Sequence, residues 1–353
     1  MGRDKKTVKF GGSSVANAEK ARQSCTIIKR DTSIQFVIFS APEGMTNTFL
    51  ALRGNGNVGK TFDENIAAID ARYLGLASGL GVHLNLAHDL SEIRRLALPA
   101  IGEIPRNDLL VSRGEYLCSK ILAEYLGFEF LDAALFMRFD EQGNYDALAS
   151  ERAWDVLKLS GDKRYVIPGF YGALPSGEIK LFPRNTSDFT AAEVARFSRT
   201  TIVFEKWTDV PGFFRADPRI VPDAEKIDEL TYKELRELTD MGSKLLYPEV
   251  VRSLRHANIS ISVRGVNHPD DPGTRIVPDG TAKLKPPGTV VGISHRDDCI
   301  LVDVEKFMMG IGYAAQVLGV FAGMGIDIGH IADGTDIISI AVTADQLKGD
   351  RLS

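Results

Sequence analysis

The sequence predicts an α/β protein in which helices cover a mostly parallel β-sheet. Apolar, β-branched runs alternate with amphipathic helical stretches through most of the chain. This alternation indicates right-handed βαβ units, and ligands of such folds bind at the carboxyl ends of the strands. The expected strands are Lys6–Phe10, Gln35–Ser40, Glu129–Asp132, Arg164–Pro168, Thr201–Glu205 and Ile259–Arg264, and the expected helices are Ala16–Arg30, Asn65–Leu80, Leu90–Leu98, Gly114–Gly127, Ala147–Leu159, Asp188–Ser198, Tyr232–Met241 and Tyr247–Ala257.

The composition is that of an ordinary globular protein. The chain has 353 residues, of which 44% are hydrophobic and 25% charged, and this length suggests two or three domains. The net charge of −5 argues against nucleic acid or an anionic membrane as the main partner. Because the chain has neither a signal-peptide core nor a run of about 18 apolar residues, a cytoplasmic location is expected.

Cysteine and histidine spacing indicates neither disulfides nor a zinc site. Cys25, Cys118 and Cys299 are far apart and form no C-x-x-C pair, so we expect reduced structural residues. The six histidines show no ligand spacing such as H-E-x-x-H.

A composition shift near residues 268–290 divides the chain. Prolines and glycines there favour a linker, so we expect a main domain at 1–270, a linker at 271–289 and a small α+β module at 290–353. The module is expected to have strands within Val290–Glu305 and at Ile337–Val342, and a helix at Tyr313–Gly325. These elements are too few for a closed sheet with two covering helices, which suggests a module that is truncated or completed by another chain.

Residues Lys9–Val15, with the sequence KFGGSSV, form the most informative local pattern. They follow the first expected strand and precede a helical stretch. A strand, a glycine turn and a helix in this order present backbone N–H groups and a helix N-terminus to a phosphate. Lys9 would add a mobile positive charge. The alternative is a plain tight turn, because many strand-to-helix turns carry two glycines.

Residues Gly54–Thr61 compete as a phosphate site because they fit the P-loop pattern G-x-x-x-x-G-K-[ST]. That pattern needs a buried strand immediately before it. The preceding residues, Met45–Arg53, have helical spacing instead, and the strand-like run Phe36–Phe39 ends about a dozen residues too early. The match is therefore interpreted as a chance hit in a polar glycine loop.

Four further polar segments lie at expected strand ends or helix starts: residues 40–47, 112–115, 183–188 and 208–219. Each also has a simple structural explanation. Ser187 or Asp188 would be a good N-cap. Glu115 in a first helical turn would complement the macrodipole, and Asp217–Arg219 would be a plain turn. Their joint order on one α/β chain is harder to explain in this way.

In this order the segments resemble the motifs of the aspartate kinase family, over about residues 6–345. Lys9–Val15 match the family's K-F-G-G-[TS]-S-V, Ser40–Asn47 match S-A-x-x-G-x-T-N, and Gly114-Glu115 match G-E. Trp207–Arg219 match W-T-D-V-P-G-[IV]-Y-x-x-D-P-R, and Met241–Pro248 match F-G-A-K-V-L-[HY]-P. Pro183–Ala192 match G-R-G-G-S-D-x-T-A-A in part. The resemblance implies a three-layer α/β/α amino-acid kinase fold, followed by a partial regulatory ACT module from Val290 onward.

The resemblance also implies a reaction. ATP would phosphorylate the β-carboxylate of L-aspartate to give 4-phospho-L-aspartate, the first step of lysine, threonine and methionine biosynthesis. The acceptor carboxylate is ionised at neutral pH, so no general base is required. Catalysis would consist of positioning two anions and neutralising the transferring phosphoryl group. Mg²⁺ would bridge the ATP phosphates and be held by phosphate and water oxygens, with no protein ligand assigned.

The resemblance assigns roles to individual residues. Lys9 is expected to neutralise the transferring phosphoryl group, and Asp188 to orient Lys9. Glu115 suits the ammonium of aspartate, and Arg184 can fork onto its carboxylate. The other expected substrate-binding residues are Ser40, Thr46 and Ser187, and the expected nucleotide-binding residues are Lys9, Gly11, Gly12, Ser13, Thr208, Asp209, Phe214, Arg219, Lys244 and Leu245.

Departures from the family pattern leave two alternatives open. Pro183, Asn185 and Thr186 stand where the family has glycines, which allow close backbone approach to a ligand. Phe214 replaces a tyrosine and keeps only the ring. The alternatives are an amino-acid kinase with a different carboxylate acceptor and a weakly catalytic regulatory partner of the same fold. The resemblance also implies lysine or threonine as an effector at the ACT region, and a homodimer.

Overall fold

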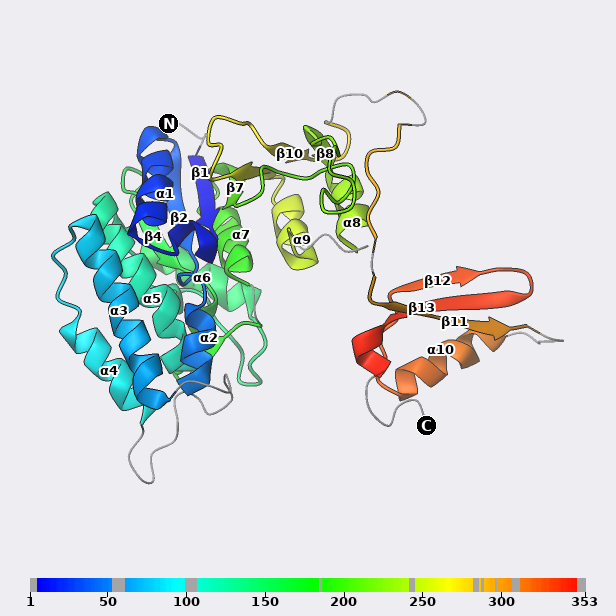
Figure 1. Cartoon of the computed structure of the whole chain (residues 1–353), viewed down its shortest axis with the longest axis horizontal. Helices are drawn as coiled ribbons and strands as arrows, with labels where there is room; N and C mark the ends of the chain where they lie inside the picture. The colour runs from blue at the N-terminus through cyan, green and yellow to red at the C-terminus, as the bar shows by residue number, and fades with distance from the viewer. Residues whose placement is uncertain are drawn as a thin grey trace. The chain divides into compact units, whose positions relative to one another are not determined.

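The computed structural model describes residues 5–52, 61–98, 107–183, 186–240, 245–281, 286, 289–295, 297–306 and 312–347. It consists of two compact units, Met1–Ile293 and Ser294–Ser353 (Figure 1). Each unit is described by itself below. Among the described helices, none has the length and hydropathy that a bilayer span requires.

The larger unit is built on one eight-stranded sheet with the strand order β3-β4-β2-β1-β7-β9-β10-β8. Every pair of neighbouring strands is parallel except β9 and β10, which are antiparallel to each other. The strands are β1 Lys5–Phe10, β2 Ile34–Phe39, β3 Glu129–Phe130, β4 Tyr165–Pro168, β7 Thr201–Thr208, β8 Glu229–Thr231, β9 Ser260–Gly265 and β10 Thr274–Val277, and a separate hairpin joins β5 Tyr171–Ala173 to β6 Ile179–Leu181. The six predicted strands are thus confirmed.

Strand β10 lies inside residues 271–289, which were predicted to be a linker. The turn residues Gly273 and Pro278 flank only four strand residues, so the segment has a loop-like composition. Pairing with β9 on one side and β8 on the other makes it a strand. The compact unit accordingly extends to Ile293, beyond the predicted boundary at residue 270.

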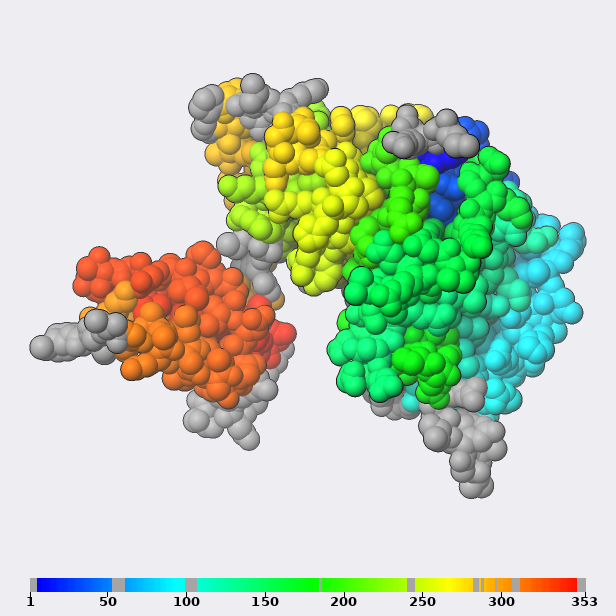
Figure 2. All heavy atoms as spheres, turned by 180° about the vertical axis from the view of Figure 1, so that it is seen from behind, coloured from blue at the N-terminus to red at the C-terminus, as the bar shows by residue number. Residues whose placement is uncertain are grey.

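Helices cover both faces of the sheet and make three layers (Figure 1). One core joins α1, α3, α4 and α5 to Val8 and Phe10 of β1, and the other joins α6, α7, α8 and α9 to Phe36 and Ile38 of β2. In the space-filling view the yellow atoms of α9 adjoin the green atoms of α7 (Figure 2). The helices are α1 Ala18–Arg30, α2 Met45–Leu50, α3 Phe62–Leu80, α4 Ala87–Ala97, α5 Asn107–Leu126, α6 Ala147–Leu157, α7 Ser187–Ser198, α8 Tyr232–Asp240 and α9 Pro248–His256.

Two helix starts differ from the sequence-based interpretation, and both differences concern the site. Helix α5 begins at Asn107, so Glu115 lies in its third turn and the explanation by the macrodipole is wrong. Helix α7 begins at Ser187, and its N-cap residue is Thr186, which makes no capping hydrogen bond through its side chain. Neither Ser187 nor Asp188 is therefore the N-cap, and both side chains are available for another purpose.

The P-loop interpretation can be tested only in part, since residues 53–60 lie outside the described residues. Helix α2 occupies Met45–Leu50, where a P-loop would require a strand. Thr61 begins α3 as the N-cap of a capping box with Glu64. Both described flanks of the segment are therefore helical.

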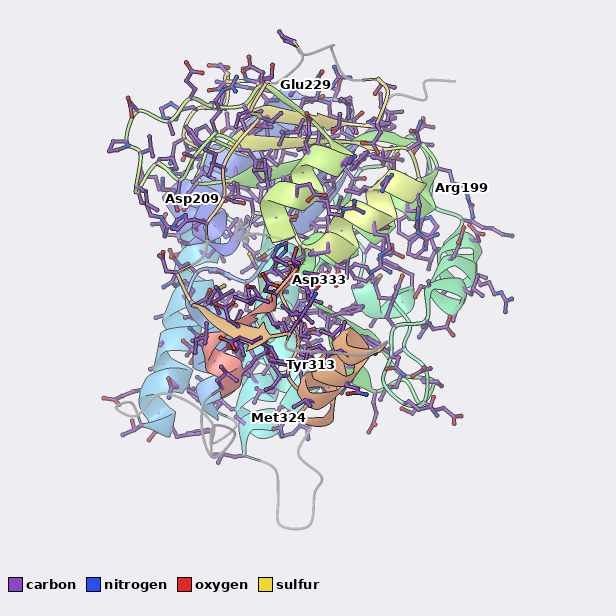
Figure 3. All side chains as sticks on the ribbon, turned by 90° about the vertical axis from the view of Figure 1, so that its right-hand side faces the viewer. Arg199, Asp209, Glu229, Tyr313, Met324 and Asp333 are labelled. Carbon is purple, nitrogen blue, oxygen red and sulfur yellow. The ribbon has the colours of Figure 1, made fainter. Side chains whose placement is uncertain are left out.

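The smaller unit has a three-stranded antiparallel sheet, in the order β11-β13-β12, with one helix packed on it. Its elements are β11 Cys299–Glu305, α10 Tyr313–Gly323, β12 His330–Asp333, β13 Ile337–Thr343 and the 3₁₀ turn η4 Ala344–Leu347. Tyr313 and Met324 mark the two ends of α10 (Figure 3). Phe321 of α10 packs against Ile338 and Ile340 of β13. The predicted helix and the strand at Ile337 are confirmed, whereas β12 was not predicted.

Candidate active site

A cavity of about 590 Å³ opens at the carboxyl ends of the central strands. Strand β1 ends at Phe10 and β2 at Phe39, and the Ser40 N–H donates to the Phe10 carbonyl at 3.2 Å. The following loops therefore lie side by side, as parallel strands require. The cavity is lined by Lys9, Gly12, Ser40, Ala41, Pro42, Glu43, Gly44, Thr46, Asn47, Glu115, Phe170, Ser187, Asp188, Lys206 and Tyr247.

Two lysines hold one carboxylate at the centre of this cavity. Lys9 of β1 and Lys206 of β7 are paired in the register of neighbouring parallel strands, so their side chains lie on the same face of the sheet. The Lys9 Nζ lies 2.8 Å from Asp188 Oδ1, and the Lys206 Nζ lies 2.5 Å from Asp188 Oδ2. Asp188 is in the first turn of α7, where the helix macrodipole also favours an anion.

Burial and neighbouring charge shift the pKa values of this cluster. Burial alone would raise the pKa of the Asp188 carboxyl, but the ammonium groups of Lys9 and Lys206 outweigh it and hold that pKa below the usual range. Burial, together with repulsion from Lys206, lowers the pKa of Lys9 against the attraction of Asp188. The carboxylate is therefore ionised near neutral pH and serves two cations at once.

The glycine turn after β1 packs closely on the loop after β2. A Cβ at Gly12 would lie 2.7 Å from the Ala41 carbonyl oxygen, closer than side chains allow, so the backbone there requires glycine. The Gly12 carbonyl accepts a hydrogen bond from the Glu43 N–H at 3.1 Å. A Cβ at Gly11 would lie 3.9 Å from the Lys9 Nζ. The turn thus fixes the loop from residue 40 to 44 next to the lysine.

Glu115 brings a buried carboxylate to the same cavity. Its Oε2 atom has no hydrogen-bond partner among the described residues. Burial raises the pKa of Glu115 to about 8, against opposing hydrogen bonds from backbone groups, including that of Ala41, and the attraction of Lys9. A buried carboxylate without a cationic partner is costly, so this side chain is suited to a ligand that supplies an ammonium group.

The structure brings together one part of the predicted site and leaves the other part outside the cavity. Cavity-lining residues among those predicted are Lys9, Gly12, Ser40, Thr46, Glu115, Ser187 and Asp188. Leu245 does not line the cavity, but its carbonyl accepts a hydrogen bond from Lys206. Arg184 and Lys244 lie outside the described residues. Gly11, Ser13, Thr208, Asp209, Phe214 and Arg219 are described but do not line the cavity.

Four of the predicted nucleotide residues, Thr208, Asp209, Phe214 and Arg219, lie at or after the carboxyl end of β7 in the sequence. The Thr208 hydroxyl donates to Asp209 Oδ1 at 2.9 Å, and the Arg219 side chain is 87% exposed. Asp209, which follows β7, and Arg199, which precedes it, lie on opposite sides of the view (Figure 3). Thr208 and Asp209 are thus at the same edge of the sheet as the cavity, and the role of all four residues in nucleotide binding stays a prediction.

Sequence reasoning assigned no role to eight of the residues that line the cavity: Ala41, Pro42, Glu43, Gly44, Asn47, Phe170, Lys206 and Tyr247. Phe170 has a left-handed backbone with φ of 79°, which is strained for a bulky side chain. A signal for Lys206 was present, because a lysine in a buried strand, directly before the Trp207-Thr208-Asp209 segment, is unusual. Its partner Asp188 is 18 residues earlier in the chain, so only the fold reveals the pairing.

Comparison with known proteins agrees with this geometry. The sequence model of the amino acid kinase family matches residues 5–265. The crystal structure of Clostridium acetobutylicum aspartate kinase superposes with a TM-score of 0.87 at 32% identity, covering 98% of this chain and 80% of that one. Escherichia coli aspartokinase III in complex with aspartate and ADP gives a TM-score of 0.80 at 26% identity, covering 99% of this chain and 81% of that chain.

A sequence relative extends the same likeness. Lysine-sensitive aspartokinase 3 of Escherichia coli strain K12 is 28% identical over 355 residues, which cover 96% of this chain and 77% of the relative. The fold and the lysine–aspartate site thus define a kinase of the amino acid kinase class. Within that class the chain belongs to the aspartate kinase family.

Proposed function

We propose that this chain is an aspartate kinase, which transfers the γ-phosphoryl group of ATP to the β-carboxylate of L-aspartate. The observation that carries this assignment is the buried Oε2 of Glu115, which has no hydrogen-bond partner among the described residues and lies in the cavity that also holds Lys9. An acceptor with an ammonium group would pair with Glu115, while its reactive carboxylate would lie toward the lysines. L-Aspartate has both groups, and family membership agrees.

The chemistry requires charge neutralisation more than proton transfer. The β-carboxylate is already ionised near neutral pH and attacks the γ-phosphorus directly, breaking the bond to the bridging oxygen of ADP. Lys9 stabilises the negative charge on the transferring group, and the N–H groups of the glycine turn assist it. Asp188 keeps the Lys9 ammonium ionised and directed toward the phosphoryl group. Ser40, Thr46 and Ser187 line the cavity and can donate hydrogen bonds to the acceptor carboxylate.

Mg²⁺ is proposed to arrive with ATP. Among the described residues, no cluster of three or more histidine, cysteine or acidic side chains could hold a metal ion. Both oxygens of Asp188 are engaged by lysines. We propose that phosphate and water oxygens hold the ion, and we assign it no protein ligand.

The remaining roles of the site residues are also proposals. Arg184 would bind the α-carboxylate of aspartate in a bidentate manner. The segment Thr208–Arg219, with Phe214 for the adenine side, would bind the nucleotide, and Lys244 would contact its phosphates. This segment follows β7, which carries Lys206 toward the cavity.

The smaller unit is proposed to be an ACT-type regulatory module. Its three-stranded antiparallel sheet with one covering helix supports this assignment. We propose lysine or threonine as its effector and a homodimer as the working assembly. Titration of aspartate-dependent turnover with each amino acid tests the effector.

The activity itself is tested by two readouts in one reaction. The chain is incubated with Mg²⁺-ATP and L-aspartate, ADP release is followed by a coupled assay, and the acyl phosphate is trapped with hydroxylamine. We expect ADP and hydroxamate in equal amounts, and only background with N-acetyl-L-aspartate. Faster turnover with another acid would indicate the other acceptor class. Failure to bind Mg²⁺-ATP by calorimetry would favour a regulatory partner without catalysis.

A further inference from the structure

Lys206 is a buried cation, and packing within the sheet does not explain why a charged residue stands at this position. It lies in β7, in the middle of the eight-stranded sheet, and is 9% exposed. Burying an ammonium group costs several kcal/mol unless it is paired and hydrogen-bonded. A lysine at this position therefore requires a compensating role, and its partners show what that role is.

The two acceptors of Lys206 come from different parts of the chain. Its Nζ donates to Asp188 Oδ2 at 2.5 Å and also to the carbonyl oxygen of Leu245. Asp188 is in the first turn of α7, and Leu245 lies three residues before α9. One ammonium group, itself at the wall of the cavity, thus joins strand β7, the start of helix α7 and the loop before helix α9.

Lys206 also changes the charge balance around Asp188. The ammonium groups of Lys9 and Lys206 share this carboxylate, so these three side chains together carry one excess positive charge. Lys9 holds Oδ1, while Lys206 holds Oδ2 and so determines the plane of the carboxylate. Removing Lys206 would leave the carboxylate free to rotate about its Cβ–Cγ bond and would remove a like charge from beside Lys9.

We propose that Lys206 is a positioning residue for phosphoryl transfer: it holds Asp188 and the Leu245 carbonyl so that Asp188 directs the Lys9 ammonium to the γ-phosphoryl group. The inference rests on the proposed function, since it needs a phosphoryl group to be transferred. It assigns Lys206 no contact with substrate. A misdirected Lys9 would leave ligand binding intact and slow the chemical step.

The test compares Lys206→Met with Lys6→Met as a matched control. Lys6 is also a sheet lysine engaged in ion pairs, in the neighbouring strand β1, but its partners are Asp31 and Glu205 and it does not line the cavity. We expect Lys206→Met to lower kcat on the order of 10²-fold with the KM for ATP changed less than about 3-fold, because small misplacements at a reacting centre have effects of that size. Lys6→Met should leave kcat within about 2-fold of the wild type.

A pH profile separates positioning from simple damage to the fold. The charged groups that face Lys9 are Asp188 of α7, Lys206 of β7 and Glu115 of α5. Without the repulsion from Lys206, Lys9 should keep its proton to higher pH, so the alkaline limb of kcat should move upward in Lys206→Met. A loss of correctly folded protein would lower the whole profile without moving this limb. If circular dichroism shows that Lys206→Met does not fold, Lys206→Gln, which retains hydrogen-bond donors, replaces it.

The outcomes distinguish this inference from the proposed function. An active wild type with an unchanged kcat in the Lys206 variant would overturn the inference alone. A variant in which the KM for ATP rises about 10-fold or more while kcat is kept would also overturn it and would make Lys206 a direct phosphate ligand. A wild type without turnover on any acid would overturn both.

Discussion

The two faces of strands β1 and β7 carry two charged clusters, which differ in whether their positive and negative charges balance. On one face, Lys6 pairs with Glu205 at 2.8 Å and with Asp31 at 2.9 Å, and the Trp207 indole N–H donates to Glu205 at 3.0 Å. Arg264 adds a second cation 3.9 Å from Glu205. Two cations here meet two carboxylates, so the cluster is balanced without any ligand.

The cluster on the other face is unbalanced and lines a cavity. Lys9 and Lys206 share only Asp188, and Glu115 nearby keeps an oxygen without a partner among the described residues. The pKa values reflect this difference. Burial would lower the pKa of Lys6, but hydrogen bonds to Glu205 and Asp31 raise it, whereas burial lowers the pKa of Lys9. Charge left unsatisfied beside a cavity therefore distinguishes the functional cluster from the structural one.

Replacing Lys9 with methionine should have the largest effect on activity. Methionine has a similar length but no charge, so the transferring phosphoryl group loses its main cation. We expect kcat to fall about 10²–10³-fold, as for the loss of one transition-state donor. The coupled ADP assay measures this, and a retained circular dichroism spectrum shows that the fold is kept. Near-normal turnover would remove Lys9 from the catalytic centre.

Asp188→Asn should have the largest effect on stability. It leaves two buried ammonium groups without a carboxylate, which costs about 3–5 kcal/mol in the free energy of unfolding, as for a broken buried ion pair. Urea denaturation measures the change. The double variant Asp188→Asn with Lys206→Met should recover part of the loss, because one uncompensated charge is gone. No recovery would mean that the lysines do not depend on this carboxylate.

Glu115 should give aspartate binding a pH dependence. Its carboxyl has a pKa of about 8 in the free protein, so it is largely protonated below that pH and ionised above it. Only the ionised form pairs with the ammonium of aspartate, so kcat/KM for aspartate should fall as the pH drops below about 8. Glu115→Gln should remove this decrease of kcat/KM at lower pH and raise the KM for aspartate about 10-fold, as for a lost charged hydrogen bond. If the variant shows the same decrease of kcat/KM below about pH 8, a group other than Glu115 causes it.

Lys6→Met should have the smallest effect, which tests the balanced cluster. Glu205 keeps Trp207 and Arg264 as partners, and the Lys6 side chain is 25% exposed. We expect a loss of about 1–2 kcal/mol in the free energy of unfolding, with kcat almost unchanged. Thermal denaturation and the ADP assay check the two parts. A large loss of activity would contradict the separation of the two faces.

The sequence alone was sufficient for the regular elements and for part of the site. The strand Ile34–Phe39 was predictable because its residues are mostly apolar and all buried, and the strand Lys5–Phe10 because Val8 and Phe10 alternate with polar residues directly before the glycine turn. The glycine turn after Lys9 was predictable because a strand, two glycines and a helix follow one another directly in the chain. Strands β8 and β10 were not, since each has only three or four residues and depends on its neighbours for its hydrogen bonds.

What the sequence determined by itself is local: the order of strands and helices, the glycine turn and the segments that carry Lys9, Glu115 and Asp188. Only the tertiary structure decided that Glu115 lies deep in α5 rather than at a helix start, and that Lys206 shares Asp188 with Lys9. The physical reason is distance along the chain. Pattern and propensity act over a few residues, whereas the register of β1 with β7 brings together charges that are about 200 residues apart.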